Sequence, residues 1–133
     1  MRPVFRSPLV RLVFASLGII GGLVFTFGDP DKWQSAPSLR FLAQVPLIPI
    51  GFWGWLGIAY GLLLLFSPTR TAGYAVGAFL FAVIAVCLVT TLNTQGPKNI
   101  WGVIAVVDVV VFHLLAIWFV TADRDAKKHA GTP

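Results

Sequence analysis

The stretch IWGVIAVVDVVVFHLLAIWFV, residues 100–120, contains no Lys, Arg or Glu. Its only ionisable side chains are those of Asp108 and His113. Its length matches the roughly 20 apolar residues that a helix needs to cross a bilayer. The stretch therefore predicts a membrane protein, and its two polar residues are the first candidates for function.

Three further apolar runs precede this one, so the chain is expected to cross the membrane four times. Backbone polar groups in lipid must pair within their own segment, which favours helices in all four runs. The predicted spans are about 9–27, 46–66, 72–92 and 100–120. Because two of the connecting loops are tight, consecutive spans should be antiparallel neighbours. The sequence predicts an all-α membrane protein: an antiparallel bundle of four transmembrane helices in one domain (residues 1–120), with a polar cytoplasmic tail (residues 121–133).

The composition supports this class. Hydrophobic residues make up 57% of the chain and charged residues 11%, whereas soluble domains carry roughly 25% charged residues. The net charge of +5 is spread over flanks and loops, a pattern that fits a membrane surface better than nucleic acid. The single cysteine, Cys87, excludes a disulfide within the chain and a cysteine-based metal site. We expect no metal, no cofactor and no nucleic-acid partner.

The distribution of Lys and Arg predicts the orientation. If the N-terminus is inside, seven basic residues are inside and three outside. The inner set is Arg2, Arg6, Arg11, Arg70, Arg124, Lys127 and Lys128, and the outer set is Lys32, Arg40 and Lys98. We therefore expect a multi-pass protein of the cytoplasmic membrane with both termini inside. The first span lacks a signal-peptidase-like cleavage site and is expected to stay uncleaved.

Two segments outside the spans carry expectations of their own. The first outer loop, residues 28–47, interleaves apolar and polar residues, which is compatible with a short helix lying in the outer interface. Its opening Asp29-Pro30-Asp31 is typical of a turn. The polar tail is expected to fray after its first turn or two.

Small residues in the spans predict close helix packing. Glycines recur with GxxxG spacing in spans one, two and three, which allows helix backbones to approach closely in lipid. The pairs are Gly18–Gly22, Gly57–Gly61 and Gly73–Gly77. The spacing alone does not decide between contacts within the chain and contacts with another chain.

Asp108 is the residue of the fourth span that is least favourable to place in a lipid bilayer. It lies about 12 Å into the helix, counted from Ile100 at the helical rise. An ionised Asp near the bilayer centre costs at least ~2.5 kcal/mol on insertion scales. No Lys or Arg lies at a matching depth. Tyr60 and the hydroxyl and amide groups at the end of span three are the available partners, so Asp108 is expected to be neutral or hydrogen-bonded to a hydroxyl.

Asp108 and His113 do not share a face of the fourth span. Five residues rotate by about 500°, which separates the two side chains by roughly 140° around the helix. If one points into the bundle, the other points toward lipid or a neighbouring chain. Both residues are either satisfied packing residues or part of a functional site, because intramembrane ionisable groups are often functional.

Several chemistries are disfavoured. A bis-histidine haem needs two intramembrane histidines, and the second histidine, His129, lies in the tail. No pair of carboxylates is placed for acid–base catalysis. We therefore expect no catalytic residues and no enzyme activity.

Two resemblances bear on function. Four spans in about 130 residues, the early Arg11-Leu12 and the SPTRTAG stretch at 67–73 resemble the DoxX-like family over roughly residues 9–92. That family usually carries a Glu in the second span, and this chain has none. The Glu-free, Ala/Val/Gly-rich character also resembles small multi-pass membrane proteins of actinobacterial phages and prophages.

These observations favour a non-enzymatic membrane protein that acts by helix–helix association with itself or with a membrane or cytoplasmic partner. In a phage or prophage it would serve exclusion of, or defence against, other phages. Its cytoplasmic docking residues would be Arg70, Arg124, Lys127 and Lys128. Three alternatives remain open: a holin-like permeabilising protein, a subunit or assembly factor of a larger membrane complex, and a small proton-coupled transporter that uses Asp108.

Overall fold

The computed structural model describes residues 7–29, 31, 50–95 and 100–131, and the regular structure within them is entirely helical. Helices α2, α6 and α7 are long and apolar enough to cross a membrane, whereas α5 is a shorter apolar helix. The all-helical prediction is confirmed for the described residues. The elements in chain order are α2 (Pro8–Phe27), α5 (Ile50–Leu65), the 3-10 turn η2 (Ser67–Thr69), α6 (Arg70–Gln95) and α7 (Ile100–Ala130).

The helices begin and end where local chemistry allows. Pro8 occupies the first turn of α2, where its missing N–H costs no hydrogen bond. The Thr69 hydroxyl donates hydrogen bonds to the carbonyls of Leu63 at 2.9 Å and Phe66 at 3.2 Å. These bonds satisfy carbonyl groups where α5 gives way to η2, so that the chain can turn directly into α6.

Two predictions about segment ends need comment. The tail does not fray after one or two turns, because α7 continues to Ala130. Good helix formers and a last turn containing Lys127, Lys128 and His129, whose basic side chains complement the helix dipole, explain the extension. The interfacial helix predicted in the first outer loop and the predicted start of span two at 46–49 lie outside the described residues.

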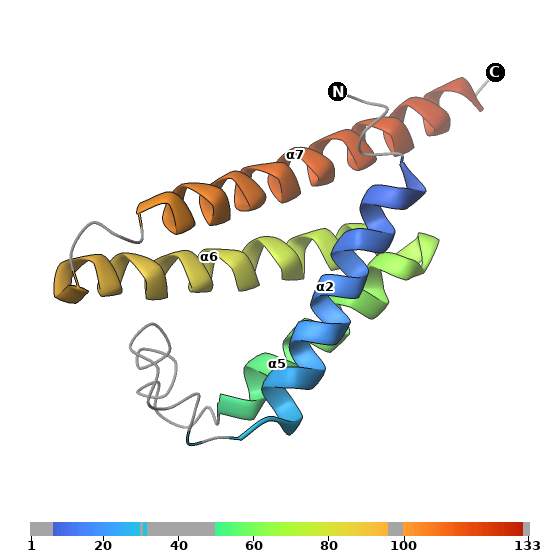
Figure 1. Ribbon diagram of the computed structural model, residues 1–133. Helices are drawn as coiled ribbons and strands as arrows, with labels where there is room; N and C mark the ends of the chain where they lie inside the picture. The colour runs from blue at the N-terminus through green and yellow to red at the C-terminus, as the bar shows by residue number, and fades with distance from the viewer. Residues whose placement is uncertain (1–6, 30, 32–49, 96–99, 132–133) are drawn as a thin grey trace.

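The helices form two antiparallel pairs (Figure 1). Helix α2 packs on α5, α6 packs on α7, and α5 also contacts α6, which joins the pairs. The pairs are inclined to each other, so they converge at one end and diverge at the other. The beginnings of α2 and α6 lie at the convergent end, together with the C-terminal half of α7.

Glycines let α2 and α5 touch backbone to backbone. A Cβ atom added to Gly22 would lie 2.5 Å from the carbonyl oxygen of Gly54, and one added to Gly61 would lie 2.6 Å from that of Ala15. A Cβ atom added to Gly57 would lie 3.2 Å from the carbonyl oxygen of Gly18. Backbones this close pack without intervening side chains and allow Cα–H···O contacts. The structure thus places both GxxxG pairs of these helices at a contact within the chain.

The outer surface is strongly apolar. Large hydrophobic side chains are exposed on every α-helix: Phe27 is 71%, Trp55 56%, Phe79 56% and Trp101 77% exposed. The buried core is small by comparison and centres on Ala15, Tyr60 and their neighbours. Soluble monomers rarely expose contiguous apolar surface on this scale, whereas lipid is a favourable surrounding for it.

The neighbouring glycines of α2 provide a direct test of this packing. An added Cβ at Gly21 meets nothing within 4 Å, in contrast to Gly22. We expect Gly22→Ala to lower the free energy of unfolding by about 1–3 kcal/mol through overpacking. Gly21→Ala should raise it by roughly 0.5–1 kcal/mol through helix propensity. Unfolding of both variants by added SDS in mixed micelles measures the difference. Equal effects of the two substitutions would contradict the close α2–α5 contact.

Candidate functional site

A buried hydrogen bond joins α5 to α7. The Tyr60 hydroxyl lies 2.7 Å from Nε2 of His113, and both side chains are fully buried at 0% exposure. The other ring nitrogen of His113, Nδ1, lies 2.7 Å from the carbonyl oxygen of Val109, one turn earlier in α7. Every polar atom of this pair therefore has a partner.

These partners fix the positions of the protons. A carbonyl oxygen only accepts, so Nδ1 of His113 carries a hydrogen and donates it to Val109. In the neutral imidazole Nε2 is then an acceptor, and the Tyr60 hydroxyl donates to it. This arrangement satisfies all groups without any charge, which suits a site within apolar helices. The pair is therefore a neutral structural clamp that holds the imidazole in one tautomer.

Aromatic rings surround the imidazole. Phe14 of α2 meets it edge-on with ring centroids 5.2 Å apart, and Phe81 of α6 lies 5.3 Å away. Tyr74, also of α6, meets it edge-on at 5.8 Å. His113 thus contacts rings from each of the other three α-helices. Gly77 provides the space, because an added Cβ there would lie 2.5 Å from both His113 Cδ2 and Tyr60 Cε2.

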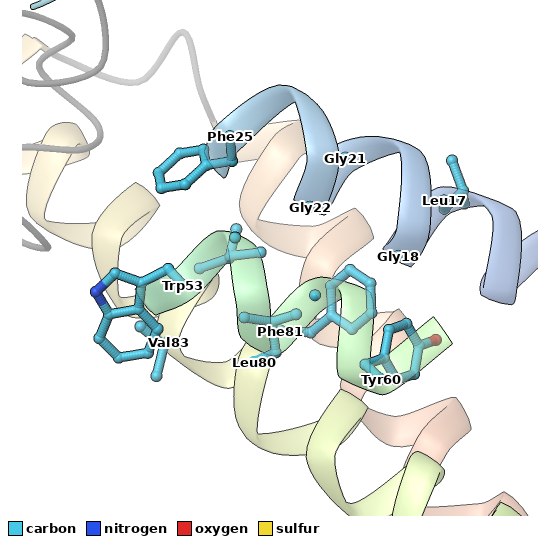
Figure 2. Close-up of a pocket in the computed structure, with 13 residues that line it drawn as sticks. Leu17, Gly18, Gly21, Gly22, Phe25, Trp53, Tyr60, Leu80, Phe81 and Val83 are labelled. Carbon is cyan, nitrogen blue, oxygen red and sulfur yellow. The ribbon is translucent and has the colours of Figure 1, made fainter. Parts of the chain in front are cut away.

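An apolar pocket of about 410 Å³ adjoins this clamp. It lies between α2, α5 and α6 where the two helix pairs diverge, and Figure 2 shows the glycines of α2 along one wall. Phe25, Trp53 and Leu80 line one part and the Tyr60 ring another. The hydroxyl of Tyr60 is already bonded to His113, so the pocket offers apolar contact rather than a polar anchor.

Asp108 is separate from both the clamp and the pocket. Its side chain is exposed on α7, among exposed apolar neighbours that include Ile104, Val107 and Val111. No residue in the described part of the chain is recorded as a hydrogen-bond or ion-pair partner of its carboxyl group. Tyr60, a partner that the sequence offered for Asp108, bonds to His113 instead. Of the two polar directions expected on this span, His113 takes the inward one and Asp108 the outward one.

The remaining predicted residues fall into two groups. The glycines Gly18, Gly22, Gly57, Gly61, Gly73 and Gly77 all lie at contacts between elements of the chain. Arg70 begins α6 at the convergent end of the helix pairs, and Arg124, Lys127 and Lys128 are exposed on the last turns of α7. Among the described residues, no three His, Cys, Asp or Glu side chains gather where they would hold a metal ion.

Sequence reasoning missed Tyr74, Phe14 and Phe81. None of them differs in type or spacing from an ordinary packing residue, and the structure distinguishes them by their ring contacts with His113.

The described residues define a helical protein with membrane-type helices and a neutral Tyr–His clamp inside, and Asp108 on its apolar surface has no partner among these residues. No family model matches the chain, and comparisons with curated proteins and with solved structures give no match either.

The hydrogen bond between Tyr60 and His113 predicts that single and double substitutions of the pair differ in their effect on the free energy of unfolding. Tyr60→Phe leaves Nε2 of His113 buried without a donor and should lower the free energy of unfolding by about 1–3 kcal/mol. Removing both partners in Tyr60→Phe/His113→Leu should cost less than the sum of the two single changes, because no orphaned polar atom remains.

Tyr74→Phe is the matched control, since the buried Tyr74 hydroxyl has no hydrogen-bond partner among the described residues. Its loss should leave the unfolding free energy in neutral detergent unchanged or slightly higher. SDS titration of all four variants gives the comparison. Strictly additive effects of Tyr60 and His113 would refute the clamp.

Proposed function

We propose that this protein is a non-enzymatic, four-pass membrane protein that works by helix–helix association, with the outer face of α7 as the associating surface. The observation that carries the proposal is Asp108: an acidic side chain exposed on an apolar helix face. In lipid this group is costly unless it is hydrogen-bonded or paired. The Tyr60 hydroxyl is committed to His113, and no other side chain among the described residues is hydrogen-bonded to the Asp108 carboxyl group, which favours a partner on a neighbouring chain.

The partner that fits best is a second copy of the same chain. In a parallel, two-fold symmetric pair, Asp108 of one copy meets Asp108 of the other at the same depth, where a carboxyl group that carries a proton can donate a hydrogen bond to its counterpart. Gly102 and Ala105, which are also exposed on α7, would allow the two helices to approach closely. No other group of the chain is needed at that depth.

The remaining parts of the architecture are consistent with this proposal. The four spans would be α2, α5, α6 and α7, and both termini would lie on the cytoplasmic side. The GxxxG glycines hold the protomer together, which leaves α7 free for a neighbour. Asp108 faces away from the pocket and the clamp, which favours association over a carrier that moves protons through the interior. A role in exclusion of or defence against phages stays a prediction, since it rests on composition alone.

Cysteine crosslinking in native membranes tests the surface. Ala105 is the sixth residue of α7 and Ala75 the sixth residue of α6, and both are exposed. We expect Ala105→Cys to form disulfide-linked dimers on mild oxidation. Ala75→Cys should stay at the background of the wild-type chain, whose one cysteine, Cys87, is buried.

The role of Asp108 is tested in the same Ala105→Cys chain. Asp108→Val should reduce the association constant about threefold to thirtyfold, corresponding to roughly 0.6–2 kcal/mol for an interhelical hydrogen bond in lipid. Asp108→Asn keeps a hydrogen-bonding side chain and should retain most of the dimer. Unchanged dimers in Asp108→Val, or equal crosslinking at positions 105 and 75, would exclude self-association through this face.

A further inference from the structure

Four buried polar atoms without hydrogen-bond partners in the described residues gather where α2 and α6 begin. They are Nε of Arg11, Nε of Arg70, the Thr71 hydroxyl and the Tyr74 hydroxyl. Tyr74 is only 1% exposed, so its hydroxyl has no ready access to bulk water. Buried polar groups in proteins are nearly always satisfied, and a cluster of orphans indicates a missing water, ion or ligand.

The cluster is also electrically unbalanced. The charge of Arg70 interacts with that of Arg11 and with Tyr74, and Tyr74 interacts with both arginines. Two guanidinium groups from different helices whose charges interact repel each other, and an anion between them would relieve that repulsion. Arg124, Lys127 and Lys128 of the α7 tail are exposed beyond the end of the membrane-type segment, where Asp123 and Asp125 offset part of their positive charge.

The available donors match a phosphate group. Each guanidinium can offer paired N–H donors to phosphate oxygens, and the hydroxyls of Thr71 and Tyr74 can each donate one hydrogen bond more. The cluster lies in the first turns of α6, a 26-residue helix, whose N-terminus favours negative charge. The beginning of α2 next to the cluster exposes Leu9 and Leu12, at 67% and 55%, where an acyl chain would lie.

We infer that Arg11, Arg70, Thr71 and Tyr74 form a binding site for a phosphate group, supplied by the headgroup of an anionic phospholipid. The site is independent of the association through Asp108, because it is formed by α2 and α6 rather than by the outer face of α7.

Purified full-length chain in maltoside micelles, which contain no phosphate, provides the test. Phosphatidylglycerol, diacylglycerol with the same acyl chains, and inorganic phosphate are titrated separately, with the thermal midpoint and retained lipid in native mass spectrometry as readouts. We expect phosphatidylglycerol to raise the midpoint and to stay bound, and diacylglycerol to do neither. If inorganic phosphate alone reproduces the shift, the phosphate site stands and its lipid source is wrong. If neither phosphate compound has an effect, the site is refuted.

Substitutions test whether phosphatidylglycerol binds at these four residues. Tyr74→Phe should weaken phosphatidylglycerol binding about tenfold, as expected for one hydrogen bond to a charged group, without lowering the midpoint in plain micelles. Arg11→Gln and Arg70→Gln should weaken binding by at least as much. Arg124→Gln removes the same charge from the exposed tail and is the matched control. Binding by Tyr74→Phe that equals wild type, or an Arg124→Gln loss as large as that of Arg70→Gln, would overturn the site.

Discussion

The hydrogen bond between Tyr60 and His113 is the constraint around which the helices are arranged. It is the polar link between the α2–α5 pair and the α6–α7 pair, at 2.7 Å and fully buried. Nδ1 of His113 is committed to the carbonyl of Val109, so the imidazole cannot turn without orphaning a buried atom. In a low-dielectric interior such orphaning is costly. The bond therefore fixes both the depth and the rotation of α7 relative to α5, and with them the face of α7 that points outward.

Glycines make this bond geometrically accessible. Any side chain at Gly77 would occupy the space of His113 and Tyr60, and side chains at Gly22 or Gly61 would push α2 away from α5. Without these close approaches Phe14 of α2 could not reach the imidazole of α7, which its ring contacts edge-on. Helix packing in lipid depends on such fit, because apolar burial supplies little driving force there. The clamp and the glycines are thus parts of one packing solution.

The sequence predicts the helices and many of the residues at helix contacts, but it does not predict which side chains meet across helices. Apolar runs predict the helices well, since length and composition determine what can lie in lipid. GxxxG spacing indicated which residues lie at helix contacts but not which helices meet. To predict the pairing of Tyr60 with His113, the depth of each residue in the membrane has to be counted from the cytoplasmic end of its span. Tyr60 lies about 7 Å before the end of α5 and His113 about 10 Å before the predicted end of the last span, whereas Asp108 lies about 18 Å before it. The cluster of Arg11, Arg70, Thr71 and Tyr74 could not be predicted because Arg11 is far from the other three residues in the sequence and only the fold relates them.

The same rotation that buries His113 determines the position of Asp108. With the two residues roughly 140° apart on one helix, a fold that satisfies the imidazole internally turns the carboxyl group outward. Turning α7 so that Asp108 points inward would break the bond between Tyr60 and His113 and expose the imidazole to lipid. Among the described residues the protomer thus satisfies His113 and leaves Asp108 at the surface. A second helix against the outer face of α7 would satisfy the Asp108 carboxyl group, so the rotation that folds the single chain would also present the surface for the proposed association.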